Sequence, residues 1–578
     1  MFGISEQGGM HMTDTTTEHT TEHTTGTATH PQTAVQSSET AAPITFERHP
    51  DFYVHWNLKV ESEIARLSMN VDPAGGLLGD YELKLNSYDI GVDIELADAI
   101  RRLRFEHPEV KVVVVDSAVE GVFCAGANIR MLAAATHSHK VNFCKFTNET
   151  RLEIEEASAE SGLRFLAAIN GACSGGGYEV AMACDHLLLV DDRSSAVSLP
   201  EVPLLGVLPG TGGLTRLTDK RHVRRDRADV FATKSEGIQG NEAVEWNLVD
   251  EVAPPSKFDE AVAARVVALA ATSSRSDDGS AVQFEALGRT ITDDLISYRF
   301  VAAKLDRIGR SVELTITATN DADWALTAAR EFDDVLCHLR FNEPTLGTLV
   351  LKTRGDASAA VRQTERLLAG ADHLARETAL LWKRVLSRLD LMARSLIGVV
   401  DPGSCFVGVL AEVLLAADRS FMLDGVFEDD DEPLPPAVIV LTDASVGPMP
   451  MANGITRITS RFWGVPADAA AAEAAIGESI DAARANELGL VTSTPDDLDW
   501  DDEVRLAIEE RASFSPDALT AMEANHRFAG PETMATKIFS RLSAWQNWVF
   551  IRPNASGPEG ALRKYGTGTR PTYDINRT

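Results

Sequence analysis

Residues Gly171–His186 read GACSGGGYEVAMACDH, and in this stretch three consecutive glycines open an apolar segment that carries a single carboxylate, Glu179. A run of glycines costs backbone entropy and begins a helix poorly. Its presence at such a position indicates either that another group approaches the backbone closely, or that the backbone adopts angles that other residues avoid. We therefore expect another group to contact these glycines.

A second loop of the same kind lies upstream. The segment VFCAGANIRML begins at Val122 and follows the apolar strand Val112–Val115, just as the glycine triplet follows the apolar run Phe165–Ile169. In both loops small residues precede a helical pattern, so that free N–H groups at the start of a helix are presented without side chains in the way. Alone, each loop is a weak signal, because most glycine-rich loops are tight turns. Two such sets of donors that converge can hold an oxygen that becomes negative during a reaction.

Two carboxylates accompany these loops. Glu179 lies on the first turn of the helix that the glycines open, and Glu201 follows in SLPEVPLLG, at the end of a predicted strand. Two carboxylates near one oxyanion site can divide acid and base roles, because their environments and their mutual repulsion separate their pKa values. The structural alternatives are a helix N-terminal acid for Glu179 and a loop cap for Glu201. The next segment, GVLPGTGGLTRL from Gly206, predicts a further turn and helix start that serves packing.

The chain also contains an internal repeat. Four segments recur in the same order with drifting offsets: LRFEHPEVKVVVVDS from Leu103 and LRFNEPTLGTLVLKTRG from Leu339, GGGYEVAMACDHLLLV from Gly175 and GVLAEVLLAADRSFML from Gly408, GGLTRL from Gly212 and NGITRI from Asn453, IQGNEAVEWNLV from Ile238 and IDAARANELGLV from Ile480. This predicts a duplicated unit of about 240 residues with loop insertions. Short β-branched strands alternate with amphipathic helices in each unit, which favours an α/β fold whose parallel strands are buried on both faces.

The second copy departs from the first where the chemistry is expected. It keeps a glutamate, Glu412, but Val409 and Leu410 replace the second and third glycines, and no counterpart of CAGA follows the strand TLVLKT. Valine resists the backbone geometry that glycine permits, and its side chain intrudes where an oxygen must enter. We expect a degenerate second unit without an oxyanion hole, in which Glu412 is an ordinary helix residue.

Composition shifts mark the expected domains. Residues 1–46 are rich in Thr and His and lack an apolar stripe, which predicts a disordered tail; its four histidines could chelate a metal, but an unstructured tract has no fixed coordination geometry. Residues 47–280 form the first unit, ending in a Ser- and Asp-rich linker, TSSRSDDGS from Thr272. Residues 281–525 form the second unit, and 526–578 a C-terminal extension.

The charge of the 578-residue chain restricts its partners. A formal net charge of −32 repels nucleic acid and anionic lipid, so an anionic ligand needs a local basic pocket. The basic stretch TDKRHVRRDR from Thr218 is either a solvated helix face or a phosphate site. Six cysteines without CxxC pairs indicate neither a zinc site nor a disulfide framework. Since neither a signal peptide nor a membrane-spanning stretch is apparent, we expect a cytoplasmic protein.

The segments FCAGANIRML, NGACSGGGYEVAMACD, PEVPLLGVLPGTGGLTRL and AVEWNLVDEV resemble the crotonase (enoyl-CoA hydratase/isomerase) superfamily, over roughly Val60–Val252. The resemblance implies a spiral of ββα turns and an acyl-CoA thioester whose carbonyl oxygen lies between the N–H groups of Ala127 and Gly176. It assigns the acid and base roles to Glu179 and Glu201, and it implies neither a metal nor a cofactor. Further substrate-binding residues by motif position are Ala125, Gly126, Asn128, Gly175 and Gly177. From their charge, the candidates for binding the CoA phosphates are Arg130, Lys220, Arg221, Arg224 and Arg225.

The chain length, the second unit and the segments TDKRHVRRDRADVF and QNWVFIRPNASGPEGALRKYG are similar to a branch of this superfamily that acts in aerobic benzoate degradation. This implies a homodimeric enzyme that opens 2,3-epoxybenzoyl-CoA with two waters and releases formate and 3,4-didehydroadipyl-CoA semialdehyde. The alternatives are a hydratase or isomerase of another acyl-CoA and a non-catalytic acyl-CoA-binding scaffold. One departure is that PEVPLLG has one residue more between Glu and Gly than the shorter hydratase pattern, so we expect Glu201 to point differently.

Overall fold

The computed structural model describes residues 43–79, 81–275, 279–427 and 434–578. Residues 1–42 of the predicted tail and residues 276–278 of the predicted linker lie outside the described residues. Ile44 and Phe46 already pack against the core of the first unit, and the Phe46 ring lies 5.1 Å from that of Phe341. The packed chain therefore begins before residue 46, the predicted end of the tail.

A six-stranded sheet forms the frame of the first lobe, residues 44–275. Its order is β1 (Trp56–Glu61), β2 (Ile64–Met69), β3 (Val112–Ser117), β5 (Arg164–Ile169), β7 (His186–Val190) and β10 (Glu251–Ala253). Only the β1–β2 hairpin is antiparallel. The strands expected from the apolar runs Val112–Val115 and Phe165–Ile169 are confirmed.

The strands of a second, smaller sheet alternate along the chain with those of the first. The smaller sheet has the order β4 (Gly121–Cys124), β6 (Gly171–Ser174), β8 (Ala196–Ser198) and β9 (Ile238–Gln239). The chain runs from a strand of the large sheet to a strand of the small one and then into a helix, three times in succession, ending in α2 (Ile129–Ala134), α4 (Gly176–Ala183) and α5 (Glu201–Leu205). This ββα repetition is the α/β architecture that the motifs predict, and the first residues of the three helices line one pocket.

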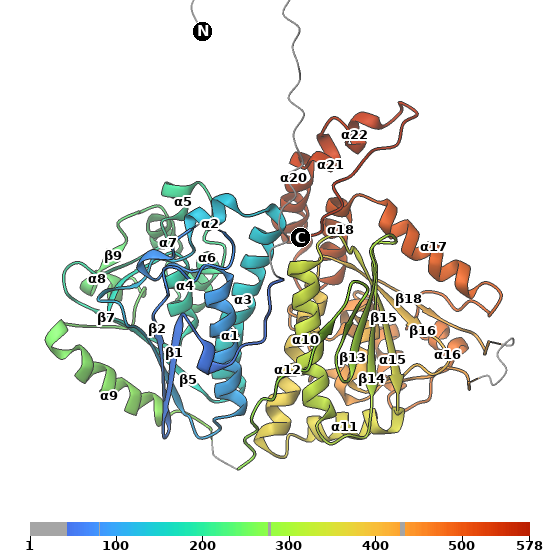
Figure 1. Ribbon diagram of the computed structural model, residues 1–578, viewed down its shortest axis with the longest axis horizontal. Coiled ribbons are helices and arrows are strands. Elements are labelled where there is room, and N and C mark those ends of the chain that lie inside the picture. The colour runs from blue at the N-terminus through green and yellow to red at the C-terminus, as the bar shows by residue number, and fades with distance from the viewer. Residues whose placement is uncertain (1–42, 80, 276–278, 428–433) are drawn as a thin grey trace, which may run out of the picture. The chain divides into compact units, whose positions relative to one another are not determined.

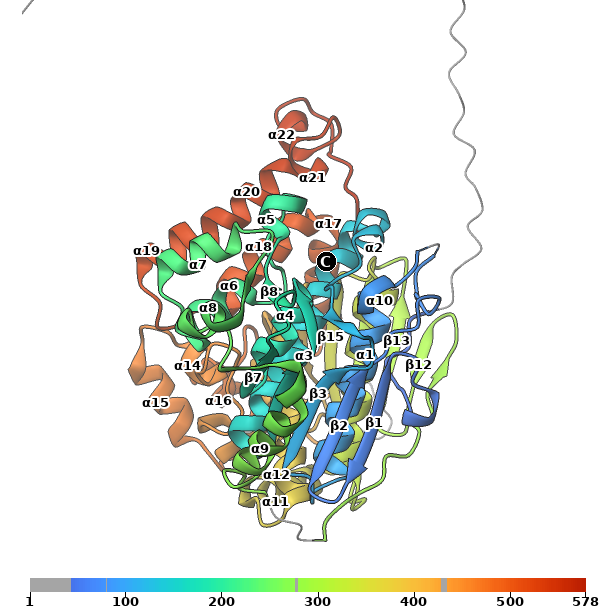
Figure 2. The ribbon, with the colours of Figure 1, turned by 90° about the vertical axis from the view of Figure 1, so that its left-hand side faces the viewer.

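Both faces of the large sheet are buried because both sets of alternating side chains are apolar. Val113 and Val115 point into the main core with α1 (Ile90–Phe105) and α3 (His137–Glu160). Val112 and Val114 pack on the other face against α9 (Phe258–Ala270; Figure 2).

The second lobe, residues 279–578, is built on a seven-stranded sheet. Its order is β11 (Thr290–Ile291), β12 (Leu295–Ser297), β13 (Val301–Asp306), β14 (Ser311–Ala318), β15 (Thr348–Gly355), β16 (Ser395–Val400) and β18 (Arg419–Met422). An antiparallel hairpin, β13–β14, is followed by the helix α10 (Trp324–Asn342) and then by parallel strands (Figure 1). The first lobe has the same order, with the hairpin β1–β2, the helix α1 and the parallel strand β3. The helix α17 (Trp500–Ser513) covers one face of this sheet, where it packs against side chains of β15, β16 and β18.

The lobes differ after the first parallel strand. In the second lobe β15 leads directly into α11 (Ala357–Ala369) and α12 (His373–Asp390), where the first lobe has β4 and the CAGA loop. The small sheet therefore contains only β17 (Phe406–Val407) and β19 (Ile439–Val440) among the described residues, and α13 (Val409–Leu415) follows β17.

The remaining helical segments are short, apart from α18. They are η1 (Pro50–Phe52), η2 (Lys84–Asn86), α6 (Gly213–Thr215), η3 (Arg216–Lys220), α7 (Arg225–Ala232), α8 (Gly240–Glu245), η4 (Pro255–Lys257), η5 (Asp443–Val446), α14 (Arg457–Arg461), α15 (Pro466–Ala474), α16 (Ala482–Glu487), α18 (Pro516–Arg527), α19 (Met534–Thr536), η6 (Lys537–Leu542), α20 (Ser543–Ile551), α21 (Pro553–Ser556) and α22 (Ala561–Lys564). Within the described ranges, every helix is too short or too polar to cross a membrane.

Buried ion pairs join the two lobes where α1 and α3 meet α10 and α12 (Figure 1). The fully buried Arg104 donates from Nε to Glu377 at 2.7 Å and from a terminal nitrogen to Glu156 at 3.0 Å. Arg340 of α10 donates to Glu149 of α3 at 2.9 Å. Charges this deeply buried remain only if they are paired, so the interface specifies one arrangement of the two lobes.

We expect Arg104→Met to destabilise the protein by roughly 3–5 kcal/mol, because it leaves the buried Glu377 without its ion-pair partner, whereas Glu156 keeps Arg384 and Lys383. Chemical denaturation followed by circular dichroism measures the loss. Arg299→Met is the matched control: Arg299 pairs with Asp321 and Asp323 while about half exposed, so its removal should cost no more than about 1 kcal/mol. Equal losses in the two variants would contradict a stabilising role for the interface pairs.

Candidate active site

The two glycine-rich loops touch each other through their backbones. Gly126 has a φ of +85°, and a Cβ at this position would lie 2.9 Å from the nitrogen of Gly176 and 2.9 Å from the carbonyl oxygen of Ser174. Through this contact the loop that contains the N–H of Ala127 adjoins the loop that contains the N–H of Gly176. In the described part of the chain, neither N–H donates to a protein acceptor. The two predicted donors are thus available to a ligand oxygen.

Each glycine of the triplet faces a different side chain, which answers why glycines are needed. A Cβ added at Gly175 would lie 2.7 Å from Oε1 of Glu201. A Cβ at Gly176 would lie 1.8 Å from Oη of Tyr88, and one at Gly177 would lie 2.6 Å from Cβ of Cys124. At Gly176 and Gly177 contacts this short leave no space for a side chain, and at Gly175 the φ of +54° favours glycine. The groups predicted to approach the backbone therefore include the second carboxylate and a tyrosine that the sequence motifs did not reveal.

Glu179 is held by the loop that follows α5. Only 2% of the residue is exposed, and Oε1 accepts from the backbone N–H groups of Thr211 at 3.1 Å and Gly213 at 2.6 Å. The hydroxyl of Thr211 donates to Oε2. The segment from Gly206, which the sequence assigns to packing, thus has a second role in positioning Glu179.

Glu201 occupies a different environment. It is the first residue of α5, it lines the same pocket as Glu179, and no partner for its Oε2 is found among the described residues. Burial raises the pKa of Glu201 to about 7, and the neighbouring charge of Glu179 acts in the same direction. A carboxyl group with this pKa is partly protonated at neutral pH and can give up a proton.

These groups surround a pocket of about 450 Å³. Of the predicted site residues, the wall contains Ala125, Ala127, Gly175, Gly176, Glu179 and Glu201. The rest of the wall is largely apolar and includes Ile129, Leu132, Phe143, Leu204 and Leu208, together with Tyr88 and Lys140. Such a volume and lining are typical of a site for a small organic group with a few oriented polar atoms.

Three of the predicted substrate-binding residues lie behind this wall. Gly126 and Gly177 make the backbone contacts described above. Asn128 caps α2, because its Oδ1 accepts from the N–H of Met131 at 3.0 Å, and its Nδ2 donates to the carbonyl of Glu82 at 2.8 Å. The side chain of Asn128 therefore orders the donor loop.

The structure does not bring most of the predicted phosphate-binding cations to the pocket. Lys220 donates to Glu155 at 3.0 Å and to the carbonyl of Ala183, and Arg221 pairs with both oxygens of Asp250 at 3.0 Å. Arg224, the N-cap of α7, and Arg225, its first residue, are both exposed. Arg224 pairs with Asp226. Arg130 is exposed next to Ile129 of the wall, and Lys140 is a lining cation that sequence analysis missed.

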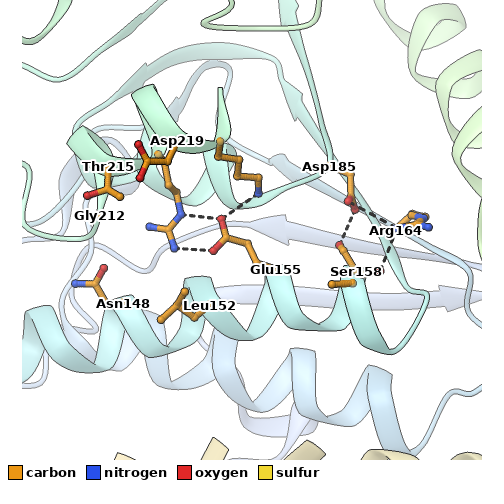
Figure 3. A pocket seen from close by; sticks show the side chains of 12 residues that line it. Asn148, Leu152, Glu155, Ser158, Arg164, Asp185, Gly212, Thr215 and Asp219 are labelled. Atoms are coloured by element: carbon orange, nitrogen blue, oxygen red, sulfur yellow. Dashed lines mark hydrogen bonds and ion pairs between the residues drawn. The ribbon is translucent and has the colours of Figure 1, made fainter. Parts of the chain in front are cut away.

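A larger pocket, of about 630 Å³, lies between α3 and the segment α6–η3, but its charges neutralise one another. Glu155 points into it and accepts from Arg216 at 2.9 and 3.0 Å and from Lys220 (Figure 3). Arg164 approaches Asp185 at the other end. Neither predicted carboxylate lines this pocket, so it is not the candidate site.

The corresponding place in the second lobe is filled. Gly408 has φ 57° and ψ −132°, against 54° and −130° at Gly175, so both helices begin with the same backbone turn. However, the N–H of Val409 donates to the hydroxyl of Thr364, on α11, at 3.0 Å. Glu412 is buried and pairs with Arg457 at 3.1 Å, so it is a buried ion-pair residue rather than an ordinary helix residue.

Comparisons with known proteins show which family the chain resembles. The sequence profile described as enoyl-CoA hydratase/isomerase matches residues 82–305. The benzoyl-CoA-dihydrodiol lyase of Aromatoleum evansii is 51% identical over 559 residues, which cover 94% of this chain and 100% of that protein. The fatty acid oxidation complex subunit alpha of Shewanella loihica is 36% identical over 148 residues, 25% of this chain and 20% of that protein.

Among solved structures, an enoyl-CoA hydratase from Bacillus anthracis matches with 26% identity and a TM-score of 0.32, covering 37% of this chain and 76% of that one. The identity to the Aromatoleum protein extends over its whole length and thus over both lobes. The chain is therefore an enzyme of the enoyl-CoA hydratase/isomerase (crotonase) family, in the branch that contains the benzoyl-CoA-dihydrodiol lyase of A. evansii.

Proposed function

We propose that this enzyme opens the ring of 2,3-epoxybenzoyl-CoA with two waters and releases formate and 3,4-didehydroadipyl-CoA semialdehyde. The reaction balances, because a seven-carbon acyl group and two waters give a six-carbon acyl group and formic acid. The observation that carries the proposal is the 51% identity to a benzoyl-CoA-dihydrodiol lyase across 100% of that protein. The alternative, a hydratase acting on another acyl-CoA, does not account for similarity that continues beyond residue 305, where the family profile ends.

In the proposed mechanism the thioester oxygen accepts hydrogen bonds from the N–H groups of Ala127 and Gly176, which stabilise negative charge on it. Glu179, positioned by hydrogen bonds from Thr211 and Gly213, takes a proton from the attacking water. Glu201, with a pKa of about 7, donates a proton to the epoxide oxygen as its C–O bond breaks. The two carboxyl groups then have exchanged protonation states, which prepares them for the second water.

The pocket supports an aromatic acyl group with a CoA tail. Its apolar side chains, among them Phe143 and Leu132, provide contact surface for a six-membered ring. Lys140 in the wall and the exposed Arg130 are the cations that we propose for the CoA phosphates. Arg225, exposed at the start of α7, is a further candidate from the predicted set.

We also propose that the second lobe is a degenerate duplicate of the first and has a structural role. The common order of hairpin, helix and parallel strands and the matching backbone angles of Gly175 and Gly408 support common descent. The bond from Val409 N–H to Thr364 supports the loss of the oxyanion hole, because the remaining donor is already used.

The function is tested by incubating the purified enzyme with 2,3-epoxybenzoyl-CoA and measuring formate and the semialdehyde. We expect one formate per epoxide consumed and at least about a hundredfold lower turnover with crotonyl-CoA, which lacks the epoxide. Sedimentation of the same preparation should give twice the chain mass of 62.5 kDa, as the family resemblance implies for a homodimer. Rapid hydration of crotonyl-CoA without formate release from the epoxide would favour the hydratase alternative.

The two carboxylates should be separable by pH. We expect Glu179→Gln and Glu201→Gln each to lower turnover by at least about a hundredfold. Because Glu201 must be protonated to act as an acid, kcat/KM of the wild type should fall as pH rises through its pKa of about 7. The residual activity of Glu201→Gln should lack this alkaline fall. Retention of the fall in that variant would assign it to another group.

Glu412→Gln tests the second lobe. Its kcat should stay within about threefold of wild type, because a side chain outside the reacting site contributes little to transition-state binding. Its melting temperature should fall, since Arg457 loses one of its two buried carboxylates and keeps only Asp390, at 2.6 Å. A collapse of kcat at unchanged thermal stability would place Glu412 in a working site.

A further inference from the structure

One polar group in the pocket is not used by the proposed mechanism: the hydroxyl of Tyr88. Tyr88 is 1% exposed and lines the pocket with Glu179 and Glu201. Its Oη is fully buried and has no hydrogen-bond partner among the described residues. Buried hydroxyls in proteins nearly always have a partner, so this orphan, at the wall of a ligand pocket, indicates that its partner is the ligand.

The backbone of Tyr88 is tied to the first donor loop. Its N–H donates to the carbonyl of Gly126 at 3.0 Å, and its own carbonyl accepts from the N–H of Asn128 at 2.9 Å. Ala127, the donor, is therefore directly beside Tyr88 in a parallel bridge. The position of the ring is fixed by the same hydrogen bonds that shape the donor loop.

The hydroxyl of Tyr88 reaches the second donor loop. Its Oη would lie 1.8 Å from a Cβ built on Gly176, so the oxygen packs on the Cα of the residue whose N–H is the second donor. The tyrosine thus spans from Ala127 to Gly176. A ligand oxygen held by those two N–H groups lies in the neighbourhood of the phenol.

The surroundings keep this phenol protonated. Burial holds the pKa of Tyr88 well above its usual range, with the guanidinium of Arg151 opposing the shift and the carboxylate of Glu179 adding to it. Arg151 lies 5.5 Å from the centre of the tyrosine ring and pairs with Asp93. The hydroxyl therefore has a proton to donate across the operating pH range.

We propose that Tyr88 is a third hydrogen-bond donor to the thioester oxygen of the substrate, acting beside the N–H groups of Ala127 and Gly176. The inference rests on the proposed function only in taking an aromatic acyl-CoA as the ligand. A phenol places a side-chain donor where charge develops on the oxygen, so its contribution grows as the carbonyl becomes an oxyanion. It also gives Gly176 a reason to be glycine that is independent of the substrate, since the hydroxyl occupies the place of a Cβ.

The test uses benzoyl-CoA labelled with ¹³C at the thioester carbonyl, which lacks the epoxide and serves as an unreactive probe. Isotope-edited infrared spectroscopy reports how far the bound carbonyl stretch falls below its value in water. The downshift should be clearly smaller in Tyr88→Phe than in the wild type. With 2,3-epoxybenzoyl-CoA, kcat of the variant should fall by about a hundredfold with a much smaller change in KM, the scale for losing one oxyanion donor.

Tyr178→Phe is the matched control. Tyr178 is fully buried on α4, the helix that begins at Gly176, but its hydroxyl donates to the carbonyl of Leu248 at 2.6 Å and the residue is outside the pocket wall. Its removal should leave the carbonyl frequency unchanged and kcat within about threefold, while lowering the melting temperature. Tyr88→Phe, which loses no protein hydrogen bond, should melt at or above the wild-type temperature without ligand.

The outcomes separate the inference from the function on which it rests. A bound carbonyl with the same frequency in Tyr88→Phe and wild type would overturn the role of Tyr88, while the acyl-CoA function stands. A marked fall in the melting temperature of Tyr88→Phe would show a structural partner for the hydroxyl and would also overturn it. A wild-type enzyme that neither binds benzoyl-CoA nor shifts its carbonyl would overturn both the proposed function and this inference.

Discussion

The backbone contact between Gly126 and Gly176 is the constraint on which the site depends. The two loops are brought together because β4 and β6 pair in parallel, with Gly121 opposite Gly171 at their start. There too a side chain is excluded, since a Cβ at Gly171 would lie 2.3 Å from the carbonyl carbon of Gly121. Glycine faces glycine at both ends of the strand pair. A side chain at either end would push the strands apart and separate the two N–H donors that must point at one oxygen.

The same geometry separates the two carboxylates in character. Glu179 receives three hydrogen bonds from Thr211 and Gly213, which fix the position of its carboxyl group. Glu201 lies against the Cα of Gly175, with one oxygen unpartnered, and burial raises its pKa. Two chemically identical groups thus meet different surroundings: three protein donors hold Glu179, whereas burial raises the pKa of Glu201. The sequence does not contain this distinction, because the donors to Glu179 come from a loop about thirty residues further along the chain.

Local patterns predicted the strands, both donor loops and the two carboxylates, because each depends on residues close together in the sequence. Tyr88 was missed because its importance arises only when the chain returns to place Gly176 on its hydroxyl. Lys220 and Arg221 were expected at a phosphate site from their clustering alone. In the fold they meet Glu155 and Asp250, from distant segments, which neutralise them. In so acidic a chain a basic cluster finds carboxylates nearby, so its composition alone does not distinguish an anion site from an ion-pair network.

The second lobe shows what a helix start looks like when no ligand is expected there. The turn at Gly408 is nearly identical to that at Gly175, yet Thr364 from α11 satisfies the next N–H. In the chain order α11 stands where the first lobe has β4 and its loop. The second lobe therefore lacks the first donor loop, and Thr364 of α11 accepts the hydrogen bond of the second donor, the N–H of Val409. In the first lobe the equivalent N–H of Gly176 has no protein acceptor among the described residues. A buried donor without a partner costs stability, so an open N–H at the wall of this pocket fits a site where a ligand oxygen supplies the missing acceptor.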